Sequence, residues 1–275
     1  MPELPEVETA VRRLRAALTD RTIERAQALH PALARRVSAA QLRSLRGARV
    51  RGVERRGKHQ LIHLADGRVL HAHFRMTGDW IVGRADDPLP RFARAVLTLD
   101  DGSRVVLDDP RALSTLDLHP DGAPIGIDLG PEPSDRSLTA RSLHTALAKR
   151  RGPIKPVLLD QRVIAGLGNI YATESLWQAR ISPIASAASL DERQLARLLS
   201  AIRRVIARAT GARYTDDSVS RLAVYDREGK ACRRCRTPIE RIVQAGRSTY
   251  FCPRCQPSPP VARTPRTARA KRRVR

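Results

Sequence analysis

The segment ARVRGVERRGKHQLIHLADGRVLHAHF, residues 48–74, determines the fold class because apolar and polar residues alternate along most of its length. Alternation is typical of strands with one buried face, and Asp66-Gly67 in its second half is a typical hairpin turn. Residues 94–109, RAVLTLDDGSRVVLDD, repeat the pattern around Asp101-Gly102. Short strands joined by such turns predict a β-sandwich or barrel rather than a parallel α/β sheet.

Helical patterns flank this β region. Residues 4–18 carry an apolar stripe with spacings of three and four, at Leu4, Val7, Val11, Leu14 and Leu18,. Helices are also expected at 141–150, 155–160, 169–179 and 190–209, after a segment rich in Pro and turn residues,. We therefore expect an α+β chain divided into a β domain at 1–130, a linker at 131–137, a helical domain at 138–225, a cysteine module at 226–257 and a disordered basic tail at 258–275,.

The charge balance indicates the kind of partner. The chain has 51 Lys and Arg against 28 Asp and Glu in 275 residues, a formal net charge of +23. This much self-repulsion favours a polyanionic partner, with nucleic acid as the first candidate and an anionic membrane as the second. No apolar run approaches the roughly 18 residues that a membrane span needs. The start MPELPEVETA is acidic and does not match a signal peptide, so we expect a cytoplasmic protein,.

The four cysteines form one local cluster in the sequence. They occur as two CxxC pairs, Cys232 with Cys235 and Cys252 with Cys255. Two such pairs at this separation supply four thiolates to a tetrahedral ion, most commonly zinc. Because the protein fills all four positions, we expect one structural Zn²⁺ that orders a hairpin with Arg247 at its tip. The alternative is four free cysteines in a core.

Residue 2 is a candidate nucleophile. An initiator methionine before a small residue such as proline is normally removed, which leaves Pro2 with a free secondary amine of pKa about 7.7–8.0. Such an amine condenses with an aldehyde-level carbon to give an iminium, and the neighbouring Glu3 and Glu6 carboxylates can move protons. The alternative is a simple helix start, in which Pro and Glu are common.

Six stretches in a single order resemble those of one protein family: MPELPEVET (1–9), RGKHQL (56–61), RMTGDW (75–80), DPRAL (109–113), IKPVLLDQRVIAGLGNIYATESLW (154–177) and the paired CxxC motifs (232–255). From residue 1 to about 256 the chain resembles the formamidopyrimidine-DNA glycosylases, in the family that also contains endonuclease VIII. The resemblance implies an N-terminal β-sandwich, a helix–two-turns–helix domain and a zinc hairpin. It also implies a monomeric glycosylase and abasic-site lyase of the bacterial nucleoid that removes oxidised bases from damaged double-stranded DNA.

The resemblance assigns catalytic roles residue by residue. It implies that Pro2 attacks C1′ of the damaged nucleoside and that Glu3 protonates the opening sugar ring. It gives Glu6 a role in orienting the site and Lys58 an acid–base role in β-elimination. Arg247 is expected to hold a phosphate and to assist δ-elimination.

The resemblance also implies a set of DNA-contacting residues: Met76, Arg111, Leu113, Arg150, Lys155 and Asn169. Met76, Arg111 and Leu113 would fill the gap left by a flipped base, and Leu113 stands where the family usually has Phe. Lys155 is expected to contact the lesion or its phosphate. Asn169 opens a helix whose free N–H groups are expected to face a DNA phosphate. Arg150 suits contacts to the DNA backbone. For Met76 the alternative is a core gap-filler.

The chain departs from the family pattern at one further place, and two alternative functions stay open. The segment 211–231 lacks the Gly- and aromatic-rich insert of the family, so we hypothesise a weaker dependence on 8-oxoguanine. A non-catalytic DNA-binding paralogue on the same scaffold is the main alternative. A general zinc-ribbon nucleic-acid binder explains the charge and the cysteines but not the start of the chain. His71 and His73 alternate on one strand and could suggest a second metal, although polar residues on a strand face are ordinary.

Overall fold

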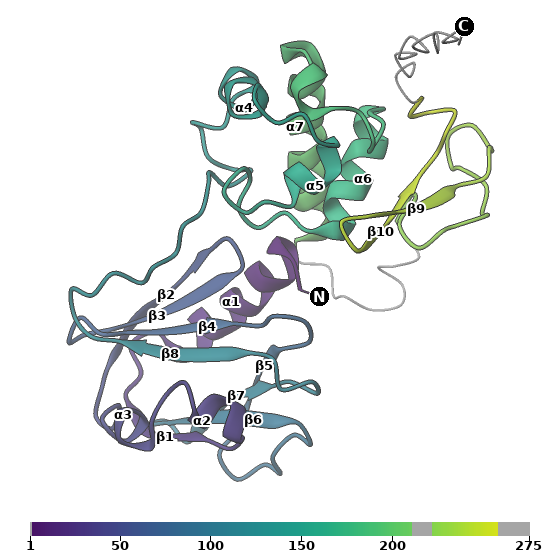
Figure 1. Cartoon of the computed structure of the whole chain (residues 1–275). Coiled ribbons are helices and arrows are strands. Elements are labelled where there is room, and N and C mark those ends of the chain that lie inside the picture. The colour runs from purple at the N-terminus through teal and green to yellow at the C-terminus, as the bar shows by residue number, and fades with distance from the viewer. Residues whose placement is uncertain (1, 211–221, 258–275) are drawn as a thin grey trace, which may run out of the picture.

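Two four-stranded antiparallel sheets form the N-terminal half of the computed structural model, which describes residues 2–210 and 222–257 (Figure 1). The first sheet has the strand order β1 (Ile23–Ala28), β6 (Ala93–Leu99), β7 (Ser103–Asp108) and β5 (Asp79–Arg84). The second has the order β2 (Val50–Arg56), β3 (His59–Leu64), β4 (Val69–His73) and β8 (Thr115–His119). The two sheets contribute to one apolar core, which confirms the expected β-sandwich,.

The two alternating segments form hairpins, as predicted. β3 and β4 turn at Asp66-Gly67, and β6 and β7 turn at Asp101-Gly102. Ile62 and Leu70 face each other across the first hairpin and are fully buried. Alternate residues therefore enter the core, and the residues between them lie on the other face of the sheet.

Helix α1 (Leu4–Leu18) joins the two halves of the molecule. Most of its predicted apolar stripe, from Val7 to Leu18, is buried in the core of the sandwich. Leu4 belongs instead to the core of the helical half. The N-terminal end of α1 therefore lies at the junction of the two halves, close to α6 and β10 in Figure 1.

The sequence pattern did not predict β1, α2 (Pro31–Ala34) or α3 (Ala39–Arg43). The two helices have four and five residues, too few for a helical repeat to be recognised,. β1 carries two exposed charged residues in succession, which interrupts the alternation of apolar and polar positions.

The second half is helical, as expected, and comprises α4 (Ala140–Leu147), α5 (Ile154–Leu158), α6 (Asn169–Ala179), the short 3₁₀ helix η1 (Ala187–Ser189) and α7 (Glu192–Ala209). Its apolar residues form a second core. α7 begins two residues later than predicted because the Asp191 carboxylate caps it by accepting the Gln194 N–H,. In the part of the chain that the structure describes, no helix has both the length and the apolar character needed to cross a bilayer.

The predicted hairpin follows the helices. β9 (Glu240–Gln244) and β10 (Arg247–Phe251) pair in antiparallel register between the two CxxC motifs. Val224 and Tyr250 form a small third core with the cysteines, against which Trp177 of α6 packs. The hairpin is therefore fixed to the same helix whose first residues lie beside the start of α1.

Candidate active site

Glu3 connects the start of α1 to the start of α6. Its side chain is 1% exposed and accepts the backbone N–H groups of Ile170 at 2.8 Å and Tyr171 at 3.3 Å. The first N–H groups of a helix have no partner within the helix, and its N-terminus favours a negative charge. We expected these donors to face a DNA phosphate. That expectation is wrong for Ile170 and Tyr171, because Glu3 already occupies them.

Two glycines before α6 make this contact possible. A Cβ atom on Gly168 would overlap the carboxyl group of Glu3, and one on Gly166 would overlap the side chain of Leu4. In both places the separation would be far below van der Waals contact. The AGLGN stretch therefore needs glycine because the start of α1 packs directly on its backbone.

Burial changes the acidity of the two glutamates. Burial raises the pKa of Glu3 to about 7, although the charge of Lys58 and the two N–H donors of α6 oppose the shift,. Burial also raises the pKa of Glu6, whose oxygens accept the Tyr171 hydroxyl and, at 2.8 Å, the Glu3 N–H. A carboxyl group with a pKa near 7 can both donate and accept a proton at neutral pH. Glu3 is therefore suited to proton transfer beside Pro2.

Lys58 lies in the turn between β2 and β3 and faces the same region. It is 9% exposed, and its ammonium donates to the Leu167 carbonyl oxygen at 3.1 Å. Burial lowers the pKa of Lys58, Glu3 opposes this shift, and the charge of Arg247 adds to it. The structure thus brings Glu3, Lys58 and Arg247 into one electrostatic environment, although they come from three separate segments.

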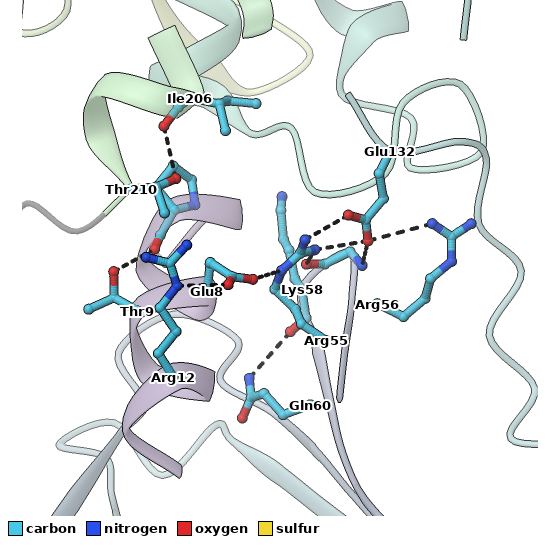
Figure 2. Close-up of polar contacts among 12 residues, drawn as sticks. Glu8, Thr9, Arg12, Arg55, Arg56, Lys58, Gln60, Glu132, Ile206 and Thr210 are labelled. Atoms are coloured by element: carbon cyan, nitrogen blue, oxygen red, sulfur yellow. Dashed lines mark hydrogen bonds and ion pairs between the residues drawn. The ribbon is translucent and has the colours of Figure 1, made fainter. Parts of the chain in front are cut away.

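A buried ion-pair cluster holds the Lys58 turn in place, as Figure 2 shows. Arg55 donates to Glu8 of α1 at 2.7 Å and, with two nitrogens, to both oxygens of Glu132 at 2.8 and 2.7 Å. Glu132 also accepts the Gly57 N–H at 2.6 Å. The cluster therefore connects α1, the turn that carries Lys58 and the segment between the two halves. Sequence reasoning missed Arg55 and Glu132, since nothing distinguishes them from surface charges before their burial is known.

Lys155 and Asn169 both contact the zinc hairpin. The Lys155 side chain is 1% exposed and donates to the Ser248 carbonyl oxygen at 2.9 Å and the Thr249 hydroxyl at 2.6 Å. Burial lowers its pKa to about 8. The Asn169 amide donates to the same Ser248 oxygen at 3.1 Å. In this structure both side chains thus hold the residue next to Arg247, whereas we expected Lys155 to contact the lesion or its phosphate.

The three expected gap-filling residues lie on two exposed turns. Met76 is 38% exposed and Leu113 is 42% exposed, and Arg111 is also exposed. The exposure of Met76 excludes its role as a core gap-filler. Arg150, by contrast, pairs with Asp160 at 2.9 Å and is half-buried, so a contact with DNA would compete with this ion pair.

The four cysteines converge as a metal site requires. Their sulfur atoms all lie within 4.8 Å of one another, and two of the pairs are 3.4 and 4.0 Å apart. Four thiolates at about 2.3 Å from a tetrahedral zinc ion lie about 3.8 Å apart, so the donor set fits Zn²⁺. Among the described residues this is the one group with such geometry. His71 instead has its ring nitrogens 2.8 Å from His59 and 3.4 Å from His119.

Comparison with known proteins gives a consistent result along the chain. Family models match residues 1–116 (formamidopyrimidine-DNA glycosylase N-terminal domain), 129–219 (the H2TH domain of the same enzymes) and 229–257 (a zinc finger found in FPG and IleRS). A formamidopyrimidine-DNA glycosylase of Symbiobacterium thermophilum is 42% identical, and the alignment covers 99% of this chain and 95% of that protein. The corresponding protein of Thermus thermophilus is 40% identical over 93% of this chain and 98% of its own length.

Solved structures agree with these relatives. The Lactococcus lactis enzyme non-covalently bound to DNA with an AP site superimposes with a TM-score of 0.86 at 30% identity, over 93% of this chain and 100% of that one. A point mutant of the same enzyme in complex with Fapy-dG DNA gives the same TM-score and identity over 94% of this chain and 100% of its own.

Proposed function

Because the chain belongs to the formamidopyrimidine-DNA glycosylase family, we propose that its Pro2 amine, Glu3 and Lys58 carry out excision and strand cleavage at damaged bases. At the level of the family, the protein is a DNA glycosylase of base excision repair, and AP lyase activity is known for this family. The observation that carries the residue assignment is the buried Glu3 carboxyl, which has a pKa of about 7 and directly follows Pro2 in the chain.

The proposed chemistry begins with a nucleophilic substitution. After removal of Met1, the neutral Pro2 nitrogen attacks C1′ of the flipped nucleotide, the damaged base leaves with the electrons of the N-glycosidic bond, and the proton that the Pro2 nitrogen loses is transferred to the departing base. Protonated Glu3 donates its proton to the ring oxygen as the C1′–O4′ bond breaks, which gives a Schiff base in the form of an iminium ion. Glu6 holds the Glu3 backbone N–H and thereby the position of Pro2.

Strand cleavage follows from the Schiff base. The iminium acidifies C2′, and loss of a C2′ proton expels the 3′ phosphate by β-elimination. We propose Lys58 as acid–base partner of this step, because its ammonium is buried beside the start of α6 and burial lowers its pKa,. Arg247 is exposed at the start of β10 and is proposed to hold the phosphate that leaves in δ-elimination,.

The zinc ion takes no part in these steps. Cys232, Cys235, Cys252 and Cys255 hold one structural Zn²⁺, and all four of its ligand positions are filled by protein,. Zinc orders the hairpin, and Lys155 and Asn169 fix its Ser248 carbonyl beside Arg247,. We propose that Lys155 and Asn169 act mainly through this contact, and that Arg150 contacts the DNA backbone once it leaves Asp160.

We propose damaged double-stranded DNA as the partner of a monomeric protein that associates with the nucleoid in the cytoplasm. Ring-opened purines, 8-oxoguanine or related lesions are the proposed substrates. The hypothesis of weaker dependence on 8-oxoguanine rests on residues 211–231, about half of which lie outside the described residues, as do Met1 and the basic tail at 258–275. Three domains with boundaries near 130 and 226 remain our proposal, supported by the three apolar cores.

Borohydride trapping tests the proposed nucleophile. The protein and a lesion duplex are mixed with borohydride, and the Schiff base is reduced to a stable protein–DNA adduct. The parent should form the adduct and Pro2→Gly should lose most of it. An active protein that forms no adduct would contradict the Schiff-base mechanism, and a protein that binds lesion DNA without excision would favour the non-catalytic alternative. Excision rates across a lesion panel decide the substrate question, since a tenfold or greater preference for 8-oxoguanine opposite C would disprove the hypothesis of a weaker dependence on 8-oxoguanine.

A further inference from the structure

Asp109 has an unusual environment for a carboxylate. It follows β7, is 0% exposed and accepts hydrogen bonds from two turns of the chain. Oδ1 accepts the Thr77 hydroxyl and, at 3.1 Å, the Arg111 N–H. Oδ2 accepts the N–H groups of Leu113 and Ser114, each at 2.7 Å, and lies 2.8 Å from the Ser114 hydroxyl. These donors saturate both carboxylate oxygens.

The two turns that Asp109 joins are those that carry the exposed Met76, Arg111 and Leu113. Thr77 directly follows Met76, so the hydroxyl contact fixes the first turn. In the second turn, the N–H groups of Arg111, Leu113 and Ser114 donate to Asp109 on the buried side. The side chains of Arg111 and Leu113 are exposed to solvent. The two turns that carry these three side chains are therefore joined by a single buried group.

The hydrogen bonds of Asp109 are of the strong type. Each donor points at an ionised oxygen, and such charge-assisted bonds are about twice as strong as neutral ones. These bonds outweigh burial and lower the pKa of Asp109, so the carboxylate is charged at neutral pH. Ala112 between the two fixed residues has a positive φ of 53°, a conformation that a non-glycine residue keeps only when its surroundings impose it,.

We propose that Asp109 is the positioning residue that holds Met76, Arg111 and Leu113 as one rigid wedge, and that it thereby sets the rate of base eversion and the choice of the opposite base. This inference rests on the proposed function, in which these three side chains replace the flipped nucleotide in the duplex. A rigid wedge enters the base stack with little loss of its own conformational freedom, whereas two independent flexible turns would have to be ordered during insertion.

The substitution Asp109→Asn tests this role because it keeps the size and removes the charge. An amide presents only one acceptor oxygen, so either the first or the second turn loses its partner. Thr77→Val removes the link to the first turn alone and should give a smaller defect. Asp101→Asn is the matched control, since Asp101 accepts the N–H and hydroxyl of Ser103 at the opposite end of β7 and touches neither turn.

Two substrates separate positioning from chemistry. Excision from a formamidopyrimidine-containing duplex needs the wedge, whereas borohydride trapping on a single strand with a preformed abasic site does not. Asp109→Asn should slow single-turnover duplex excision at least about tenfold, equivalent to about 1.4 kcal/mol in the barrier. It should also reduce the ratio of rates opposite C and opposite A, while single-strand trapping remains close to that of the parent and of Asp101→Asn.

Either of two results would overturn the proposal. The first is duplex excision with unchanged rate and opposite-base ratio in Asp109→Asn. The second is an equal loss on duplex and single-strand substrates, which would assign Asp109 a general role in folding. Failure of the parent itself to form the trapped adduct would instead refute the proposed function, so the two failures are distinguishable.

Discussion

Replacing Glu3 with glutamine should stabilise the protein above neutral pH while abolishing base excision. The side chain is fully buried, and burial raises the pKa of Glu3 from 4.5 to about 7. In the unfolded chain the carboxyl ionises near 4.5, so between these two values the folded state holds a proton that the unfolded state has lost. Stability therefore falls as pH rises through this window.

The size of this loss of stability follows from the shift in the pKa of Glu3. A difference of about 2.5 pKa units corresponds to about 3 kcal/mol at about 1.36 kcal/mol per unit,. Below pH 4.5 the burial of Glu3 does not lower the free energy of unfolding through this ionisation, and above pH 7 it lowers that free energy by the full amount,. Glutamine carries no charge and keeps one oxygen for the Ile170 N–H, so Glu3→Gln should lose most of this pH dependence,.

Urea unfolding of the zinc-loaded protein at several pH values from about 5 to about 9 measures the effect. The parent should lose stability between about pH 5 and pH 7.5, and Glu3→Gln should be more stable than the parent at about pH 8.5. Excision of a damaged base should be lost in the variant, because the proposed proton donor for ring opening is absent. Equal pH dependence of the two proteins, or a less stable variant at the alkaline end, would refute the account of Glu3.

Three further changes test other parts of the site. Glu132→Gln removes the carboxylate that accepts two of the Arg55 hydrogen bonds, while Glu8 stays paired with Arg55, and should cost about 1.5–3 kcal/mol of stability, seen as a lower melting temperature, and should also slow β-elimination,; unchanged stability would contradict the role of this cluster. Cys252→Ser should reduce bound zinc and weaken DNA binding together, measured by metal analysis and fluorescence anisotropy, and tight binding without zinc would be inconsistent with a structural ion,. Lys155→Ala removes one of the two side-chain donors to the Ser248 carbonyl and should lower δ-elimination relative to β-elimination in product-end analysis, whereas an unchanged product ratio would separate Lys155 from the hairpin.

The sequence predicted the elements that have a regular repeat. The alternating strands, the apolar stripe of α1 and the paired CxxC motifs each depend on local spacing, and the structure confirms all three. The short helices α2 and α3 lack a repeat of sufficient length and were therefore missed.

Long-range contacts in the candidate site were harder to foresee. The motif around Gly166 and Gly168 indicated a phosphate-binding helix end, but Glu3, which is distant in sequence, takes two of its N–H donors. Nothing local in the sequence shows that Arg55 and Glu132 are buried together, or that Asp109 accepts hydrogen bonds from two turns. Such contacts depend on tertiary packing.

The most direct test of the central claim is to locate the trapped DNA on the protein. Borohydride-reduced adducts are digested and the modified peptide is identified by mass spectrometry. We predict that the sugar fragment is attached to the nitrogen of Pro2 in a chain that has lost Met1. Attachment to a lysine such as Lys58 or Lys155, or full strand-cleaving activity in a protein that retains Met1, would contradict the account.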